Sequence, residues 1–320
     1  MNVLQSLKFV QGAVSKKDFV PALTHFQIRD GRITGYDGKM SLSAPIALDL
    51  DCCPKADTFA KAIATCEETA QLHMAANGKL AVRSGKFKAA VECLPPELYP
   101  GVVPQGDYVQ VNGNLLEAFR IMYDFSAEDA SRPWAAGVLL DGNYMVATNN
   151  VVFAQHWIGF HFPYRANIPR ATVKELLRIG ENPTVIQITG NSIVFHYEGD
   201  RWLQSHLVQH EWPNVDGLMA KIQPWHQQDF GLTQDFWEAI DTLEPFVDGL
   251  NHLYMDEDGM HTAKVDGADV QVKGLPQAVV NHKMLTLLAG VAHTLDIGAW
   301  PQPMTWYGEN IRGLFVGMAE

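Results

Sequence analysis

The chain has 320 residues, 47% of them hydrophobic and 19% charged, which is typical of a globular protein with two or three domains and excludes a disordered one. Its formal net charge of −12 argues against a general coat protein for nucleic acid. Residues 1–104 contain 12 basic and 10 acidic residues, a net charge of +2. Residues 105–216 contain 7 basic and 12 acidic residues, a net charge of −5, and residues 217–320 contain 5 and 14, a net charge of −9.

The first third of the chain predicts four elements. Residues 3–14, VLQSLKFVQGAV, have the apolar spacing of an amphipathic helix. In HFQIRDGRITGY, Asp30-Gly31 lies between two strand-like runs and supplies the positive φ angles of a tight hairpin turn. A second helix is predicted over residues 58–68, TFAKAIATCEE, and a second hairpin over residues 80–94, with its turn at Gly85.

The middle third predicts the same order. A helix over residues 114–125, NLLEAFRIMYDF, precedes a hairpin at Asp141-Gly142. A second helix over residues 170–181 then precedes a strand pair over residues 192–208, which turns at Gly199.

The last third of the chain predicts the same order of elements once more. A helix over residues 234–246 precedes a hairpin at Asp258-Gly259, and a helix over residues 281–295 precedes strands over residues 304–318 with Gly308 between them. The three Asp-Gly turns are 111 and 117 residues apart, which indicates an internal repeat. We therefore predict an α+β fold of three repeated domains, residues 1–104, 105–217 and 218–320, each made of two helix-plus-hairpin halves.

The sequence gives no sign of an active site or a bound metal. HExxH, GxSxG and GxGxxG are absent, and the four cysteines form no CxxC pair, so we expect no enzyme activity, no metal and no cofactor. Adjacent Cys52-Cys53 suit reduced thiols. The first residues lack the pattern of a signal peptide and no run is long enough for a membrane helix, so we expect a cytoplasmic protein.

Several segments, in their order and spacing, resemble the bacterial DNA sliding clamp, the β subunit of DNA polymerase III. They are LTHFQIRDGRITGYDGKMSLSAPIAL, LAVRSGKFKAAVECLPPELYP, SRPWAAGVLLDGNYMVATNNVVFA, IPRATVKELL and EWP. The resemblance covers nearly the whole chain and is weakest in the last third. It implies three domains of similar topology in each subunit, with helices lining the inside of a ring and antiparallel sheets outside. Two subunits would form the ring around duplex DNA.

The resemblance also implies which basic residues contact DNA. Such contacts would be independent of sequence and sensitive to salt. The positions that match the family are Lys16, Lys17, Lys61, Arg132, Arg170, Lys174 and Lys283.

A second implied site is a hydrophobic groove that binds short peptide motifs of DNA polymerases and the clamp loader. The matching segments are Thr148-Asn149-Asn150-Val151-Val152-Phe153 and Leu314-Phe315-Val316-Gly317-Met318, with Ala135 nearby. Both segments depart from the family's usual residues, which have a Gly-His-Arg-Leu-like stretch in the first and a Met-Pro-Met-Arg-Leu-like ending. These departures leave the groove's specificity open and favour a divergent, phage-encoded member.

The function that the resemblance implies is a processivity factor in DNA replication: a homodimer that encircles duplex DNA and tethers a replicative polymerase. Phe59 and Ile63 are candidates for the subunit interface, although core packing explains them equally well. An alternative keeps the fold but changes the function. In it, the chain is a clamp-like decoy or adaptor that binds replication proteins without encircling DNA, which the altered groove and the acidic last third would favour.

Overall fold

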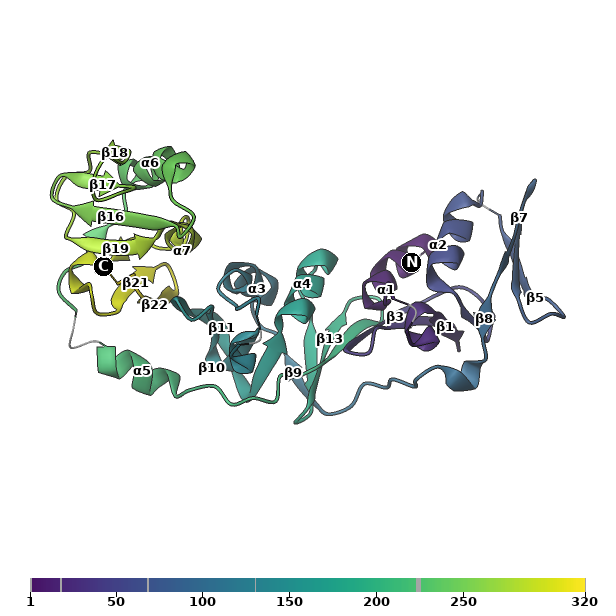
Figure 1. Cartoon of the computed structure of the whole chain (residues 1–320). Helices are drawn as coiled ribbons and strands as arrows, with labels where there is room; N and C mark the ends of the chain where they lie inside the picture. Colours follow the sequence, from purple (N-terminus) through teal and green to yellow (C-terminus); the bar gives the residue numbers. More distant parts are fainter. Residues whose placement is uncertain (1, 18, 68, 130, 223–225, 320) are drawn as a thin grey trace. The chain divides into compact units, whose positions relative to one another are not determined.

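The computed structural model describes residues 2–17, 19–67, 69–129, 131–222 and 226–319. The chain divides into two compact units. Unit 1 comprises Met1–Leu116 and Lys174–Leu207, and unit 2 comprises Glu117–Val173 and Val208–Glu320. The observed α+β class confirms the predicted one, while the division into three domains stays a prediction. Figure 1 shows the elements along the chain.

A seven-stranded antiparallel sheet forms the body of unit 1. In spatial order its strands are β1 (Phe26–Arg29), β2 (Arg32–Tyr36), β3 (Met40–Pro45), β14 (Arg201–His206), β13 (Ser192–Tyr197), β12 (Val185–Ile188) and β9 (Asp107–Gln110). The pair β3–β14, in which Leu42 lies opposite Leu203, joins strands that are far apart in the sequence. β3 has no exposed residue, so this junction is part of the hydrophobic core.

Helix α1 (Val3–Val10) continues as a 3-10 turn over Gln11–Ala13, which accounts for the predicted helix. It buries Leu7, Phe9 and Val10 and contacts strand β3. Asn2 caps its N-terminus: the Asn2 side chain accepts from the Gln5 N–H at 2.9 Å, and the Asn2 N–H donates to the Gln5 side chain at 3.0 Å.

Replacing Asn2 with alanine should lower the free energy of unfolding by about 1 kcal/mol, because one helix-terminal N–H loses its acceptor. Urea denaturation of the wild type and Asn2→Ala measures this difference. Asn2→Asp is the matched control, since aspartate keeps the acceptor and should retain the stability. An equal loss in both variants would contradict the capping role.

The rest of unit 1 contains α2 (Ala56–Thr65), two small sheets and part of α4 (Arg170–Ile179), which runs across the division between the units. Helices α1 and α2 lie side by side (Figure 1). The four cysteines are free thiols. The small sheets pair β4 (Cys53–Pro54) with β8 (Cys93–Leu94), and β5 (Gln71–Met74) with β6 (Leu80–Ser84) and β7 (Phe87–Val91).

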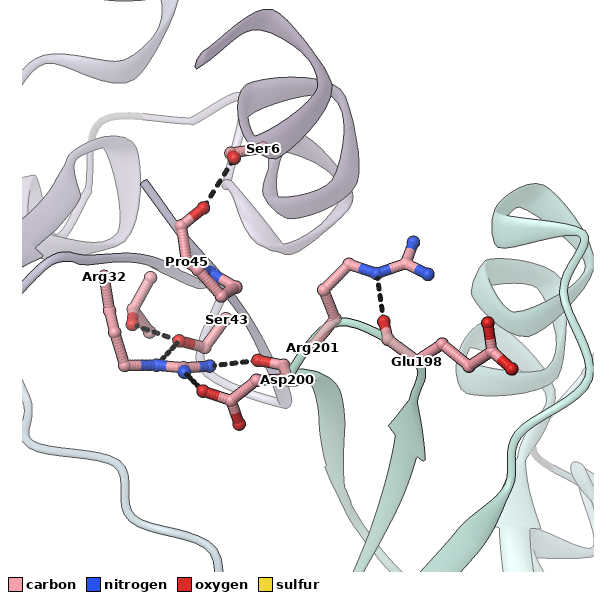
Figure 2. A network of polar contacts seen from close by, with 8 residues as sticks. Ser6, Arg32, Ser43, Pro45, Glu198, Asp200 and Arg201 are labelled. Carbon is pink, nitrogen blue, oxygen red and sulfur yellow. Dashed lines mark hydrogen bonds and ion pairs between the residues drawn. The ribbon is translucent and has the colours of Figure 1, made fainter. Parts of the chain in front are cut away.

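Ion pairs tie the β13–β14 turn to its neighbours in unit 1. The Arg32 guanidinium donates to Asp200, to the Ser43 hydroxyl and to a backbone carbonyl, while Ser6 donates to the carbonyl of Pro45 at 2.6 Å (Figure 2). Arg201 forms a bidentate pair with Glu181 at 2.8 and 2.5 Å, and this hydrogen bonding lowers the pKa of Glu181. The pair of Arg32 with Asp200 links the two halves of the large sheet, which meet at β3 and β14.

Two antiparallel sheets form the body of unit 2. The first is six-stranded, with the spatial order β10 (Gly137–Thr148), β11 (Val152–Pro169), β22 (Ile311–Phe315), β21 (Met304–Gly308), β20 (Thr294–Leu295) and β15 (Phe230–Gly231). The second is four-stranded, with the order β18 (Asp269–Val270), β17 (Gly259–His261), β16 (His252–Asp256) and β19 (Ala278–Asn281).

The remaining helices follow the sequence-based predictions with two differences. α3 (Leu115–Tyr123) and α6 (Gln234–Leu243) lie where predicted. α7 spans only His282–Leu285 before a 3-10 turn over Thr286–Leu288, and Thr294–Leu295, predicted as the end of the helix, pairs as a strand. α5 (Val215–Ile222) was not predicted.

The three Asp-Gly dipeptides that were predicted as hairpin turns adopt three different structures. Asp30-Gly31 forms the predicted hairpin turn, with φ angles of 51° and 68°. The hairpin predicted at Asp141-Gly142 is wrong: the two residues lie inside the continuous strand β10, at a bulge where its pairing with β11 shifts. At the third position the hairpin exists, but Asp256 pairs with Gly259, so the turn consists of Glu257-Asp258.

No helix among the described residues is long and apolar enough to cross a membrane.

His156, on β11, makes the stability of unit 2 depend on pH. Burial lowers the pKa of His156 below its ordinary value of 6.5, so the unfolded chain binds a proton that the folded chain resists. The free energy of unfolding should therefore decrease as pH falls below about 6.5. Urea midpoints measured between about pH 7.5 and pH 5.5 should depend less on pH in His156→Gln than in the wild type, while exposed His210→Gln should match the wild type. Equal slopes in all three would contradict this assignment.

Candidate functional site

An apolar cavity of about 280 Å³ lies in unit 2 at the start of strand β11. Segments from four parts of the chain line it. They contribute Arg132, Trp134, Thr148, Asn150, Val151, Phe153, Trp212, Pro213, Val215, Leu218, Pro303, Leu314 and Val316.

The turn between β10 and β11 forms one wall. The Asn149 carboxamide oxygen accepts from the N–H groups of Val151 and Val152, at 3.0 and 2.7 Å, and Asn150 adopts a positive φ of 76°. The Thr148 hydroxyl donates to the carbonyl of Val152 at 2.8 Å. The turn is thus held by its own side chains and presents half-buried Val151 to the cavity.

Two tryptophans form the opposite wall. The rings of Trp134 and Trp212 meet edge to face, with their centroids 4.9 Å apart. Trp212 packs in a buried cluster with Leu139, Val146, Phe153 and Leu314, against which Val215 and Met219 of α5 also pack. The helix that the sequence did not predict therefore helps to build the site.

The last strand and the segment after it complete the rim. Leu314 pairs with Phe153 across β22 and β11, and Val316 is 43% exposed beside the opening. Met318 lies outside the lining: its N–H donates to the carbonyl of Val279 at 2.7 Å, and its carbonyl accepts from the Trp300 indole at 3.0 Å.

The structure brings together Thr148, Val151, Phe153 and Val316 from the residues predicted to form the groove. Ala135 and Val152 are fully buried beneath the surface and do not line the cavity. Sequence reasoning missed Trp134, Trp212, Leu218 and Pro303. An aromatic residue before a proline and a helix-capping residue, as in Trp212-Pro213-Asn214, was an available signal.

The cavity suits apolar side chains of a peptide. Its lining is predominantly aliphatic and aromatic, and Arg132 is its charged member. Such a surface offers burial of hydrophobic groups together with a few polar contacts at the rim, which is typical of a binding site. Among the described residues, no group of three His, Cys, Asp or Glu side chains is placed to hold a metal ion.

The residues predicted to contact DNA occupy several environments. Lys16, Lys17, Lys174 and Lys283 are exposed, and Lys61 is exposed but paired with Asp57 at 2.7 Å. Arg132 is exposed at the rim of the apolar cavity. Their role toward DNA stays a prediction.

Arg170 differs from the others because its side chain is only 17% exposed. Its guanidinium donates to the carbonyls of Tyr123 and Ser126, and it lies 3.9 Å from the centroid of the Tyr123 ring. It also pairs with Glu128 at 3.1 Å. These contacts indicate that Arg170 stabilises the segment after α3.

Phe59 and Ile63, on α2, are 0% and 7% exposed and belong to the core of unit 1. Their predicted role at a subunit interface stays untested, and in this chain both side chains serve internal packing.

Comparison with solved structures finds one fold over the full length of the chain. The DNA polymerase sliding clamp from Bacillus subtilis is 18% identical, with a TM-score of 0.81 over 99% of this chain and 97% of that one. The Helicobacter pylori beta clamp bound to a DNA ligase peptide is 14% identical, with a TM-score of 0.81 over 99% and 98%. The DNA polymerase III beta subunit from Thermotoga maritima is 15% identical, with a TM-score of 0.78 over 99% and 97%.

No family model and no curated protein matches the sequence. The chain therefore has the fold of bacterial beta sliding clamps, at 14–18% sequence identity to these three structures.

Proposed function

We propose that this protein is a DNA sliding clamp: a non-enzymatic ring of two subunits that encircles duplex DNA and tethers a DNA polymerase. The observation that carries the proposal is the match to beta clamps over 99% of this chain and 97–98% of theirs, with no large segment missing from either. A cytoplasmic location and a phage source remain proposals of the same kind.

The proposed DNA contacts are the exposed lysines Lys16, Lys17, Lys174 and Lys283. Lysine binds the phosphate groups, which are the same at every base pair, so the contacts would be independent of base sequence and weakened by salt. The whole chain has a net charge of −12, so its other surfaces would repel DNA and confine the contacts to these lysines.

The proposed dimer would form between unlike edges of two copies. In the described chain, β7 and β18 each pair with one neighbouring strand, so both leave an open edge. Lys86 and Lys88 lie at β7, while Asp266 and Asp269 lie at β18. Opposite charges and open edges favour pairing between two subunits, which would also protect these strands from aggregation.

The proposed client site is the apolar cavity between Val151, Trp212 and Val316. The Helicobacter pylori clamp was solved with a DNA ligase peptide, which supports peptide binding by this fold. We propose that apolar side chains of short motifs in a polymerase and a clamp loader fill this cavity.

The decisive experiment compares retention on nicked circular DNA with retention on the same DNA made linear, with the clamp loader of the source organism present and the salt concentration raised. Salt weakens phosphate contacts but cannot release a closed ring from a circle. We expect retention on the circle and loss from the linear form. Lys17→Glu and Lys174→Glu should reduce loading on the circle.

The alternative, a decoy or adaptor that does not encircle DNA, rests on the altered groove residues and the net charge of −9 in the last third. It predicts equal loss from both DNA forms and no effect of the two charge reversals. A loader that is active on its own clamp is the control that makes this outcome interpretable.

A further inference from the structure

A second cavity, of about 500 Å³, adjoins the apolar one in unit 2. The two cavities share Trp212 and Val215 in their linings, so this short segment forms the partition between them. The second cavity is polar. Its polar residues include Asp141, Asn143, Gln155, His161, Arg165 and Asp216.

Both cavities open on the same face of the six-stranded sheet. Phe153 and Gln155 are two positions apart on β11, and their side chains therefore point to the same side. Thr148 and Val146 lie opposite them on β10. One step of two residues, about 7 Å, thus separates the apolar cavity from the polar one along the strand. Alternate side chains of an extended peptide have the same spacing.

The bulge in β10 makes room for the polar cavity. Asp141 pairs with Arg165 and Gly142 with Phe162, but Tyr144 pairs with Trp157, so β11 has extra residues at this point. Gly142 and Gly159 adopt positive φ angles of 57° and 82°. The interrupted ladder leaves side chains of both strands beside an open space rather than in a regular sheet surface.

The charges that line the cavity do not cancel. Arg165 pairs with Asp141 at 3.1 Å, and His161 hydrogen-bonds to Asn143 at 3.0 Å. Asp216 is exposed and has no ion-pair partner among the described residues. The uncompensated charge is therefore a carboxylate, which complements a cation.

A buried polar group at the same place also lacks a partner. Trp212 is 7% exposed, and its indole N–H has no acceptor within the described chain. An unpaired buried donor is costly, so a ligand that offers a carbonyl oxygen here would stabilise it. Beside it, Gln155 is 4% exposed and its side-chain oxygen accepts from Arg312 at 2.8 Å.

We propose that the polar cavity is a second recognition site, which binds a lysine or arginine side chain of the same peptide whose apolar residues fill the first cavity. Asp216 pairs with the basic group, and the indole N–H of Trp212 donates to a backbone carbonyl of the peptide. This inference rests on the proposed function of the apolar cavity.

A structural role of Asp216 is the competing explanation. Asp216 lies in the first turn of α5, where a carboxylate stabilises the helix N-terminus, and Asn214 already caps that end by accepting from the Gly217 N–H at 2.9 Å. If Asp216 had only a structural role, replacing it would change the binding of all peptides equally. A loss of preference confined to basic peptides therefore distinguishes the two explanations.

The experiment starts with a display library of short random peptides selected on the full-length protein, on Asp216→Asn and on Asp216→Lys. Asp229→Asn is the matched control, because Asp229 is an exposed carboxylate outside both cavities. We expect wild type and Asp229→Asn to enrich peptides with a basic residue at a fixed spacing from apolar ones. Asp216→Asn should lose that basic position, and Asp216→Lys should enrich an acidic residue there.

One selected peptide and its variant with glutamine at the basic position then complete a double-mutant cycle by fluorescence anisotropy. Wild type should bind the basic peptide about three- to tenfold more tightly than the glutamine peptide, and Asp216→Asn should bind both alike. An equal preference for the basic peptide in wild type and Asp216→Asn would overturn the assignment of Asp216. Enrichment of apolar residues without a basic position would overturn the second site alone, whereas no enrichment of apolar residues would overturn the peptide groove as well.

Discussion

Replacing Val316 with aspartate should weaken the binding of peptides selected on the wild-type protein by about 100-fold. Val316 is 43% exposed at the rim of the apolar cavity, so the new carboxylate would remain hydrated in the free protein and lose water when a peptide covers it. A loss of about 100-fold corresponds to close to 3 kcal/mol, within the range for an unpaired buried polar group. Fluorescence anisotropy with a labelled peptide measures the change.

The matched control for this variant is Val265→Asp, because Val265 is 76% exposed and lies outside the cavity. Both variants should keep the free energy of unfolding within about 0.5 kcal/mol of the wild type, as is usual for exposed positions. Equal peptide affinities in Val316→Asp and the wild type would show that the client binds elsewhere.

Replacing Arg170 with alanine should lower the free energy of unfolding by about 3 kcal/mol. The side chain donates to the carbonyls of Tyr123 and Ser126 and to the Ser126 hydroxyl, and it stacks on the Tyr123 ring. Removing it leaves these acceptors without their donor in a partly buried place, where each charged hydrogen bond contributes about 1.5–3 kcal/mol and a cation–π contact about 1 kcal/mol. Urea denaturation followed by circular dichroism measures the loss.

Arg132→Ala is the control for Arg170→Ala, since Arg132 is exposed and makes no ion pair with any described residue. It should leave stability unchanged. If Arg170→Ala instead kept full stability while losing retention on circular DNA, the role of Arg170 would be contact with DNA and not support of the segment after α3.

Two Asp-Gly dipeptides show where sequence reasoning about the fold succeeded and where it failed. Asp30-Gly31 formed the predicted hairpin because the flanking runs are short and pair with each other. Asp141-Gly142 has the same chemistry, but its flanks continue into one strand whose pairing with the 18-residue β11 absorbs the dipeptide as a bulge. Long-range pairing decided the second case, and no local pattern reports it.

The lining of the apolar cavity also depends on long-range packing that no local sequence pattern reports. The resemblance placed Val151 and Val316 together, although they are far apart in the sequence. Trp134 and Trp212 were missed because their approach depends on α5 and on packing against the buried cluster. Apolar residues in loops look alike in a sequence whether they cover a core or line a site.

The seven-stranded sheet of unit 1 also determines how the protein can be cut into pieces. A fragment ending near residue 104 would carry β3 without β14, and thus expose the backbone edge of a strand that is otherwise buried. Such an edge is a template for pairing with another chain. Proteolytic nicking between residues 100 and 105 should therefore leave both products associated, and the isolated N-terminal fragment should aggregate. For unit 1, we therefore expect an independently folding piece to need strands from both sides of the predicted domain boundary.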